Sequence, residues 1–105
     1  LSDTEVTDGV NIINNLVPEE LSLHQNYPNP FNPQTTINWS MPHPGMVSIT
    51  IYNLQGQNID NLFYGFKDAG THEQIWDASI LPSGTYFYRM ILNKTTLQKK
   101  MLLLK

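Results

Sequence analysis

The strongest constraint on the fold of this chain is a set of short segments in which apolar and polar residues alternate. The clearest segment is 47–52, where Val47, Ile49 and Ile51 alternate with serine, threonine and tyrosine. Successive side chains of a β-strand point to opposite faces, whereas an amphipathic helix buries every third or fourth residue. A period of two therefore predicts a strand with one buried face.

Five further segments are predicted as strands, and turn signals separate them. In 35–41, Ile37, Trp39 and Met41 share one face; the less regular segments are 58–64, 71–76, 85–92 and 95–105. The expected connections are rich in proline, glycine or asparagine: Pro42–Gly45, Asn53–Gly56, Gly65–Gly70, a type I turn at Leu81–Gly84, and Asn93–Lys94. Six or seven short, evenly spaced strands predict an all-β fold, an antiparallel β-sandwich of about seven strands.

The segment Tyr27–Pro33 carries a proline at every second or third position. Proline lacks the amide donor and restricts the residue before it to extended conformations, so this segment cannot be a helix or a central strand. Five of the seven prolines lie between Pro28 and Pro44. They could form a proline-rich ligand for a partner, but protection of the sandwich edges is the favoured interpretation.

The first twenty residues differ in character from the rest. They hold five of the nine acidic residues and show no sustained period; these acids are Asp3, Glu5, Asp8, Glu19 and Glu20. We expect residues 1–20 to be a flexible acidic linker that is open to proteolysis, and 21–105 to be the folded domain. A short helix at Val10–Leu16 is the alternative, weakened by Asn14, Asn15 and Pro18. Glu19 and Glu20 could form a pair of carboxylates, but adjacent side chains point apart in an extended chain, so a solvated linker is the favoured interpretation.

Composition excludes several classes of function. A chain of 105 residues, 40% of them apolar, can build one modest core. Its formal charge of −3 and six basic residues disfavour a nucleic-acid partner. The absence of cysteine excludes disulfides, thiolate zinc sites and a thiol nucleophile. The chain contains no run of about 18 apolar residues that could span a bilayer, and any export signal is expected to lie elsewhere.

No catalytic, cofactor or metal site is predicted. The three histidines, His24, His43 and His72, lack the spacing of metal ligands. Ser40, His43 and Asp60 could supply the atoms of a catalytic triad, but no nucleophile-elbow pattern accompanies them or Ser83. Turn chemistry explains Ser83 better. Trp39 and Trp76 could stack on sugar rings, although the phase of Trp39 with its apolar neighbours favours the core.

The last predicted strand has an unusual pattern. Thr95–Lys100 has Leu97 as its only large apolar side chain, and four apolar residues, Met101–Leu104, then follow in succession. Alternation places two of these four on each face. One face can be buried in the sandwich, while the other is either covered by a loop or available to a partner. The lysines on both sides of the run would discourage indiscriminate association.

Five segments, in order and in register, carry a family resemblance. They are Tyr27–Pro33, Ile51–Gly56, Trp76–Asp77, Pro82–Arg89 and Lys99–Lys105. The chain from Leu21 to Lys105 resembles the type A sorting domain of the type IX secretion system, and it is similar to the immunoglobulin-like domain of flagellar hook-capping proteins. It departs from the family pattern before Trp76, where His72 and Gln74 replace apolar residues and Ile75 is out of phase.

The resemblance implies an immunoglobulin-like, non-catalytic sorting module without a cofactor. It further implies a covalently attached N-terminal cargo, recognition by the outer-membrane translocon, removal by a sortase-like peptidase in the linker, and arrival outside the cell or at its surface via the periplasm. The implied recognition residues are Gly84, Tyr86, Lys100, Met101, Leu103 and Lys105. The alternative is a structural or carbohydrate-contacting accessory domain of a secreted multidomain enzyme. A sorting domain must be the last domain of its gene, whereas such an accessory domain can lie anywhere.

Overall fold

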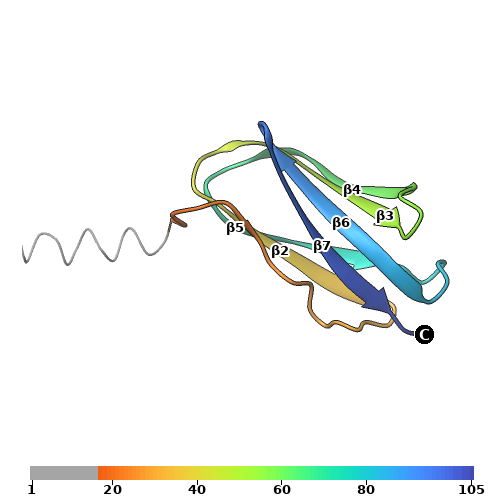
Figure 1. Ribbon diagram of the computed structural model, residues 1–105. Helices are drawn as coiled ribbons and strands as arrows, with labels where there is room; N and C mark the ends of the chain where they lie inside the picture. The colour runs from red at the N-terminus through yellow and green to blue at the C-terminus, as the bar shows by residue number, and fades with distance from the viewer. Residues whose placement is uncertain (1–16) are drawn as a thin grey trace, which may run out of the picture.

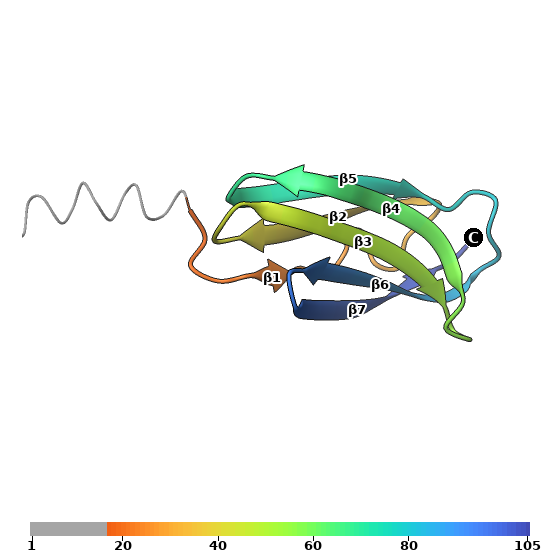
Figure 2. The same ribbon diagram turned by 90° about the horizontal axis from the view of Figure 1, so that it is seen from above.

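The computed structural model describes residues 17–105, which form seven strands and no helix. The strands are β1 (Ser22–Leu23), β2 (Gln34–Met41), β3 (Gly45–Asn53), β4 (Asn58–Lys67), β5 (Gly70–Asp77), β6 (Gly84–Leu92) and β7 (Thr95–Leu103). They form two antiparallel sheets, with strand orders β1-β2-β5 and β4-β3-β6-β7. The sheets pack face to face (Figures 1 and 2), so the predicted immunoglobulin-like β-sandwich is confirmed.

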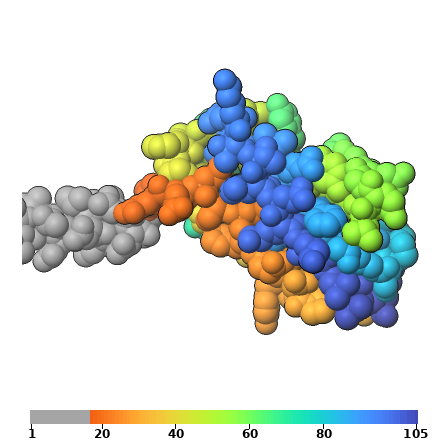
Figure 3. Space-filling model, viewed as in Figure 1, coloured from red at the N-terminus to blue at the C-terminus, as the bar shows by residue number. Residues whose placement is uncertain are grey.

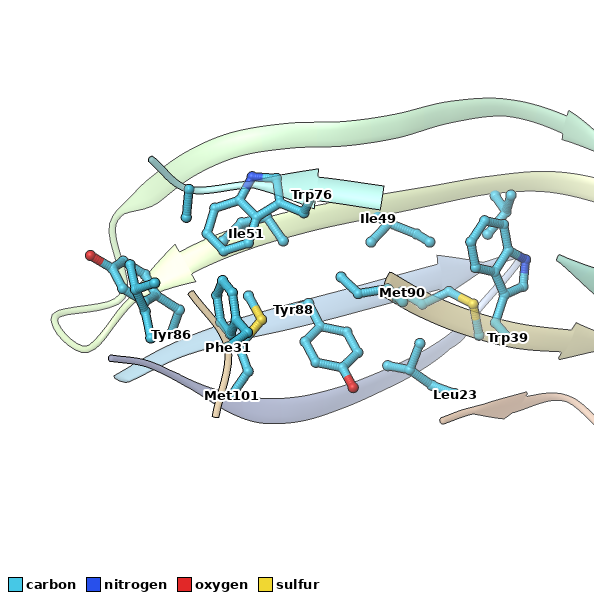
Figure 4. Packing of buried hydrophobic residues seen from close by; sticks show 14 of the residues in the cluster. Leu23, Phe31, Trp39, Ile49, Ile51, Trp76, Tyr86, Tyr88, Met90 and Met101 are labelled. Atoms are coloured by element: carbon cyan, nitrogen blue, oxygen red, sulfur yellow. The ribbon is translucent and has the colours of Figure 1, made fainter. Parts of the chain in front are cut away.

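The core lies between the sheets and is built from alternate positions of the long strands. Figure 4 shows these side chains pointing toward one another from both sheets. Trp39, Tyr88 and Met90 are completely buried, which confirms the core position expected for Trp39. Each large apolar side chain buried in this way stabilises the fold by about 1.5–3 kcal/mol relative to an exposed position.

Strand β5 pairs with β2 without interruption. This pairing determines which side chains of β5 face the core, which the irregular sequence of the strand left open. Trp76 lies opposite Thr35 and His72 lies opposite Trp39. Trp76 is buried, and the His72 ring lies 5.7 Å from the ring of Trp39. Ile75 therefore points outward and is 58% exposed. The polar His72 is half-buried, and its ring is tilted by 41° relative to that of Trp39.

The connection expected at Gly65–Gly70 is wrong for four of its six residues, because only Asp68 and Ala69 lie between β4 and β5. Strand β4 continues to Lys67, and Gly65 pairs with Val47 of β3. A Cβ atom at Gly65 would lie 3.1 Å from the Phe63 ring, which is tighter than ordinary contact. The glycine thus allows a side chain to lie close to the backbone of a strand and does not mark a turn.

The type I turn expected at Leu81–Gly84 is also misplaced. The hydrogen-bonded turn lies three residues earlier, where the Leu81 N–H donates to the Ala78 carbonyl at 3.0 Å. The three other predicted connections separate the strands that they were expected to separate, although Gly45 and Asn53 belong to β3. Gly56 has φ of 85° and donates its N–H to the Asn53 carbonyl, and Asn93 has φ of 55° in the two-residue turn between β6 and β7.

The proline-rich segment runs along the edges of both sheets. Tyr27 forms a bridge with Thr36 of β2, and Phe31 forms a parallel bridge with Leu103 of β7. The segment thereby protects strand edges, as its prolines predicted. Strand β1 was not anticipated, because its two residues pair with β2 through contacts that no local pattern reveals.

Residues 1–16, and with them the alternative helix at Val10–Leu16, lie outside the described residues. Val17–Glu20 lead into β1 at one end of the sandwich, whereas β7 finishes at the opposite end (Figures 1 and 2). The two ends are therefore well separated.

Candidate recognition surface at the end of the terminal hairpin

Most of the residues implied in recognition meet at one end of the β6–β7 hairpin. Gly84 lies opposite Leu103 and Tyr86 lies opposite Met101 in the antiparallel register. Leu104 and Lys105 follow this end of β7. Lys100 also lies on β7, paired with Phe87 one step closer to the middle of the sandwich.

Lys105 connects the end of β7 to the loop that precedes β6. Its backbone N–H donates to Ser83 Oγ at 2.9 Å, and its Nζ donates to the Ser79 carbonyl. We call the surface formed by the loop Ser79–Ser83 and the chain end Leu102–Lys105 the tip. The tip lies at the end of the sandwich away from residue 17 (Figure 1).

Tyr86 holds the loop of the tip from inside. Its side chain is 5% exposed, and its hydroxyl donates a hydrogen bond to the Pro82 carbonyl at 2.8 Å. Its ring lies 5.9 Å from the ring of Trp76 in an edge-on arrangement. Both the ring and the hydroxyl are therefore engaged within the domain, so Tyr86 shapes the tip and offers little surface to a partner.

Gly84 is required by its backbone conformation. Its φ is 156°, and a Cβ atom at this position would meet no other atom within 4 Å. A side chain would thus have room, but side chains disfavour this value of φ. Gly84 lets the chain pass from the loop of the tip into β6.

The proline-rich segment clamps the end of β7. The Phe31 N–H donates to the Leu102 carbonyl, and the Leu104 N–H donates to the Phe31 carbonyl, both at 3.0 Å. The Leu102 N–H donates to Asn29 Oδ1, also at 3.0 Å. Phe31 is 2% exposed and its ring lies 5.9 Å from that of Trp76. Asn29 and Phe31 belong to a motif that supported the resemblance, but sequence reasoning gave neither of them a place in the site.

The two faces of the terminal run have opposite environments. Met101 and Leu103 are buried in the core, whereas Leu102 is 36% exposed and Leu104 is 51% exposed. Ile80, in the loop of the tip, is 93% exposed. The side chains that a partner of the folded domain could touch here are therefore Leu102, Leu104 and Ile80 together with the exposed lysines.

A buried tyrosine, Tyr88, holds the chain just before the proline-rich segment. The Tyr88 hydroxyl donates to the His24 carbonyl at 2.6 Å and accepts the N–H of Asn26 at 2.8 Å. Burial raises the pKa of Tyr88 to about 12, although the hydrogen bond from the Asn26 backbone acts in the opposite direction. The Asn26 side chain in turn donates to the Pro28 carbonyl and to Thr35 Oγ1. This network sets the path of the proline-rich segment.

Asp77 shapes the other side of the tip. Its Oδ1 accepts the backbone N–H of Ser79 at 2.8 Å, and its Oδ2 accepts a bond from Gln34. The hydrogen bonds from Ser79 lower the pKa of the Asp77 carboxyl, with a smaller contribution from Gln34. The carboxylate thus fixes the start of the loop that carries the exposed Ile80.

The groups considered for catalysis are used elsewhere. Ser40 Oγ lies 3.1 Å from His24 Nε2, and Asp60 Oδ2 accepts the indole N–H of Trp76 at 3.1 Å. Ser40, His43 and Asp60 therefore form no triad. Within residues 17–105, no group of three or more His, Cys, Asp or Glu side chains could hold a metal ion.

Two further observations concern sugars and membranes. Trp39 and Trp76 are 0% and 2% exposed, so neither indole face is free to stack on a sugar ring. Among the described residues, no helix is long and apolar enough to cross a membrane.

Comparison with known proteins gives one family. The model of the family described as "Secretion system C-terminal sorting domain" matches residues 25–104, which is well over half of the chain. No curated protein matches the chain.

Proposed function

Because this chain belongs to the family of type IX secretion system C-terminal sorting domains, we propose that it carries a covalently attached N-terminal cargo across the outer membrane. In this proposal the outer-membrane translocon recognises the folded domain in the periplasm. A sortase-like peptidase then cuts in the linker before Leu21, and the cargo is secreted or stays at the cell surface. The domain itself contributes no catalysis, as is general in this family.

The position of the tip is the observation that carries this proposal. The tip lies at the end of the sandwich opposite the segment that leads into β1 (Figures 1 and 2), so a cargo attached before residue 17 would leave it accessible. It combines exposed apolar side chains, Ile80, Leu102 and Leu104, with the positive charge of Lys105. Apolar contact supplies affinity in protein interfaces, while charge speeds and orients the encounter.

The implied recognition residues divide into two roles in this proposal. Gly84, Tyr86, Met101 and Leu103 position the tip, because they are buried or held within the fold. Lys100 and Lys105 are exposed and act on the encounter with the translocon. We therefore expect Lys100→Ala with Lys105→Ala to weaken export less than changes to the exposed leucines, since surface charges tune association more than they hold a complex.

A cargo fusion tests the proposal. The full chain would be fused behind a reporter that has its own signal for entry into the periplasm, and expressed in a bacterium with a type IX secretion system. We expect the reporter at the cell surface or in the medium, and in the periplasm when the translocon is deleted. Equal surface arrival in both hosts would contradict the proposal, as would periplasmic retention of a folded fusion in both.

Deletion of residues 100–105 is a weaker test than substitution. It would remove Met101 and Leu103, two buried core side chains, together with the backbone groups that bind Phe31. Loss of large core side chains costs about 2–5 kcal/mol each, so the truncated fusion would fail by unfolding. Variants of exposed residues separate recognition from stability.

A further inference from the structure

Only part of the outer edge of β7 is covered. In its antiparallel pairing with β6, Leu102 directs its N–H and C=O away from β6, toward Asn29 and Phe31. Along an antiparallel strand, residues that point their N–H and C=O groups toward the partner strand alternate with residues that point them away. Lys100, Gln98 and Thr96 therefore also direct these groups away from β6. The Lys100 carbonyl accepts a bond from Gln25 Nε2 at 2.8 Å. The covered part of the edge therefore ends at Lys100.

Between Thr96 and Lys100 no further strand of residues 17–105 is hydrogen-bonded to the edge, because β7 is the last strand of its sheet. The nearest strand of the other sheet, β1, has two residues and pairs with β2. Unpaired N–H and C=O groups along an edge are a template for an added strand. The opposite edge strand, β4, is less suited, because two register shifts against β3 interrupt it and it carries Asp60.

A groove follows the open part of the edge. It has a volume of about 260 Å³ and is lined by Leu21, Ser22, Leu23, Leu97, Gln98 and Lys99. Leu21 and Leu97 are half-buried against the core, so the floor of the groove is apolar. Figure 3 shows the dark-blue surface of β7 running beside the orange surface of the segment that contains β1. Alternate side chains of an added strand would point into this groove.

The charge along the hairpin indicates what kind of strand would bind. Residues 84–105 contain five basic residues and no acidic residue; they are Arg89, Lys94, Lys99, Lys100 and Lys105. The whole chain, in contrast, has a formal charge of −3. An acidic segment is attracted to such an edge, whereas a second copy of β7 would bring like charges together.

We propose that the edge Thr96–Lys100 binds an extended acidic segment of the secretion machinery by β-strand addition. Main-chain hydrogen bonds to Thr96 and Gln98 provide affinity, and the groove beside Leu97 takes an apolar side chain. Lys99 and Lys100 select for carboxylates. The assignment of the partner to the secretion machinery rests on the proposed sorting function, while the binding chemistry rests on the edge itself.

Nuclear magnetic resonance on the full chain tests the proposal with a defined probe. The probe is a capped nonapeptide of alternating valine and glutamate. One control peptide replaces glutamate by lysine, and another keeps glutamate but carries N-methyl groups on alternate amides, which removes donors. Of the three peptides, we expect only the unmethylated acidic peptide to shift the amide signals of Thr96 and Gln98. Near saturation it should slow the deuterium exchange of these amides by about tenfold.

A pair of variants at one position separates backbone pairing from side-chain contact. Gln98→Pro removes the outward N–H and sets a ring against the edge, whereas Gln98→Ala keeps the N–H. We expect Gln98→Pro to lose the peptide and Gln98→Ala to bind it as the wild type does. If Gln98→Pro does not fold, the N-methylated peptide still decides the question.

Four results would overturn the proposal. The first two are the absence of binding by the acidic peptide and equal binding of the N-methylated peptide. The third is slow deuterium exchange at the Thr96 and Gln98 amides in the free monomer. The fourth is protection of these amides from exchange that rises with protein concentration, which would identify a second copy of the chain as the occupant. None of these measurements needs a secretion host. Failure here would leave the sorting function standing, and failure of export with intact peptide binding would overturn the sorting function alone.

Discussion

Replacement of Tyr88 by phenylalanine removes one oxygen atom from the centre of the structure. That oxygen joins the second sheet to the start of the proline-rich segment, since it donates to the His24 carbonyl and accepts the N–H of Asn26. Tyr88 is completely buried, and Asn26 is 2% exposed. The ring of phenylalanine fills the same space, so the substitution leaves no large cavity and isolates the effect of the hydroxyl.

The expected loss of stability follows from these two hydrogen bonds. A typical intramolecular hydrogen bond contributes about 1 kcal/mol net, and a buried donor left without a partner costs about 1–3 kcal/mol. The buried N–H of Asn26 loses its acceptor, so Tyr88→Phe should lower the free energy of unfolding by about 2–4 kcal/mol. Domains of this size have about 5–15 kcal/mol in total, so the change is large.

Urea unfolding measures this loss, because both tryptophans are buried and their fluorescence reports unfolding. Tyr64→Phe is the matched control, since Tyr64 is 73% exposed, and it should change stability by no more than about 0.5 kcal/mol. A loss for Tyr88→Phe as small as that of the control would refute the reasoning, and the network around Asn26 would then not hold the segment.

Three further predictions concern the ionisation of Tyr88, the backbone of Gly84 and the ring of Phe31. The free energy of unfolding should fall as pH rises from 10 to about 12. The reason is that Tyr88 has a pKa of about 12 in the folded state, so it keeps its proton there after the unfolded chain has lost it near the ordinary value of 10.0. If the free energy of unfolding of Tyr88→Phe fell with pH as steeply as that of the wild type, this prediction would be contradicted. Gly84→Ala should lower stability by about 1–2 kcal/mol because its φ of 156° is strained for alanine, and an unchanged urea midpoint would show that no strain arises. Phe31→Ala should cost about 3–5 kcal/mol, by loss of its buried ring, and should speed deuterium exchange at the Leu102 and Leu104 amides; unchanged exchange there would mean that Phe31 does not clamp β7.

Local patterns predicted those elements whose cause is local. The alternation around Ile49 fixes a strand because one face of it is buried, and Gly56 and Asn93 fix turns because they adopt positive φ. Gly65 could not be placed in the same way, because a glycine in a turn and a glycine under the Phe63 ring have the same sequence signature. Only the packing of β4 distinguishes them.

The candidate site shows the same division. Alternation alone indicated that Met101 and Leu103 share one face and that Leu102 and Leu104 share the other. Which face is buried depends on the pairing of β7 with β6, since a shift of one residue would exchange the faces. The contact between Asn29 and Leu102 spans 73 residues of sequence, and no local pattern encodes a contact of that range.

Export of a fusion that carries one changed side chain tests the central claim, that the exposed tip carries the sorting signal. Leu104→Glu alters the tip, and Met46→Glu is the matched control on β3, because the two side chains are 51% and 45% exposed. If both variants fold as the wild type does, we predict that Leu104→Glu lowers surface arrival of the cargo by about tenfold, as expected for loss of about 1.4 kcal/mol of binding, while Met46→Glu exports normally. A folded Leu104→Glu fusion that reaches the surface at the full rate would contradict the account.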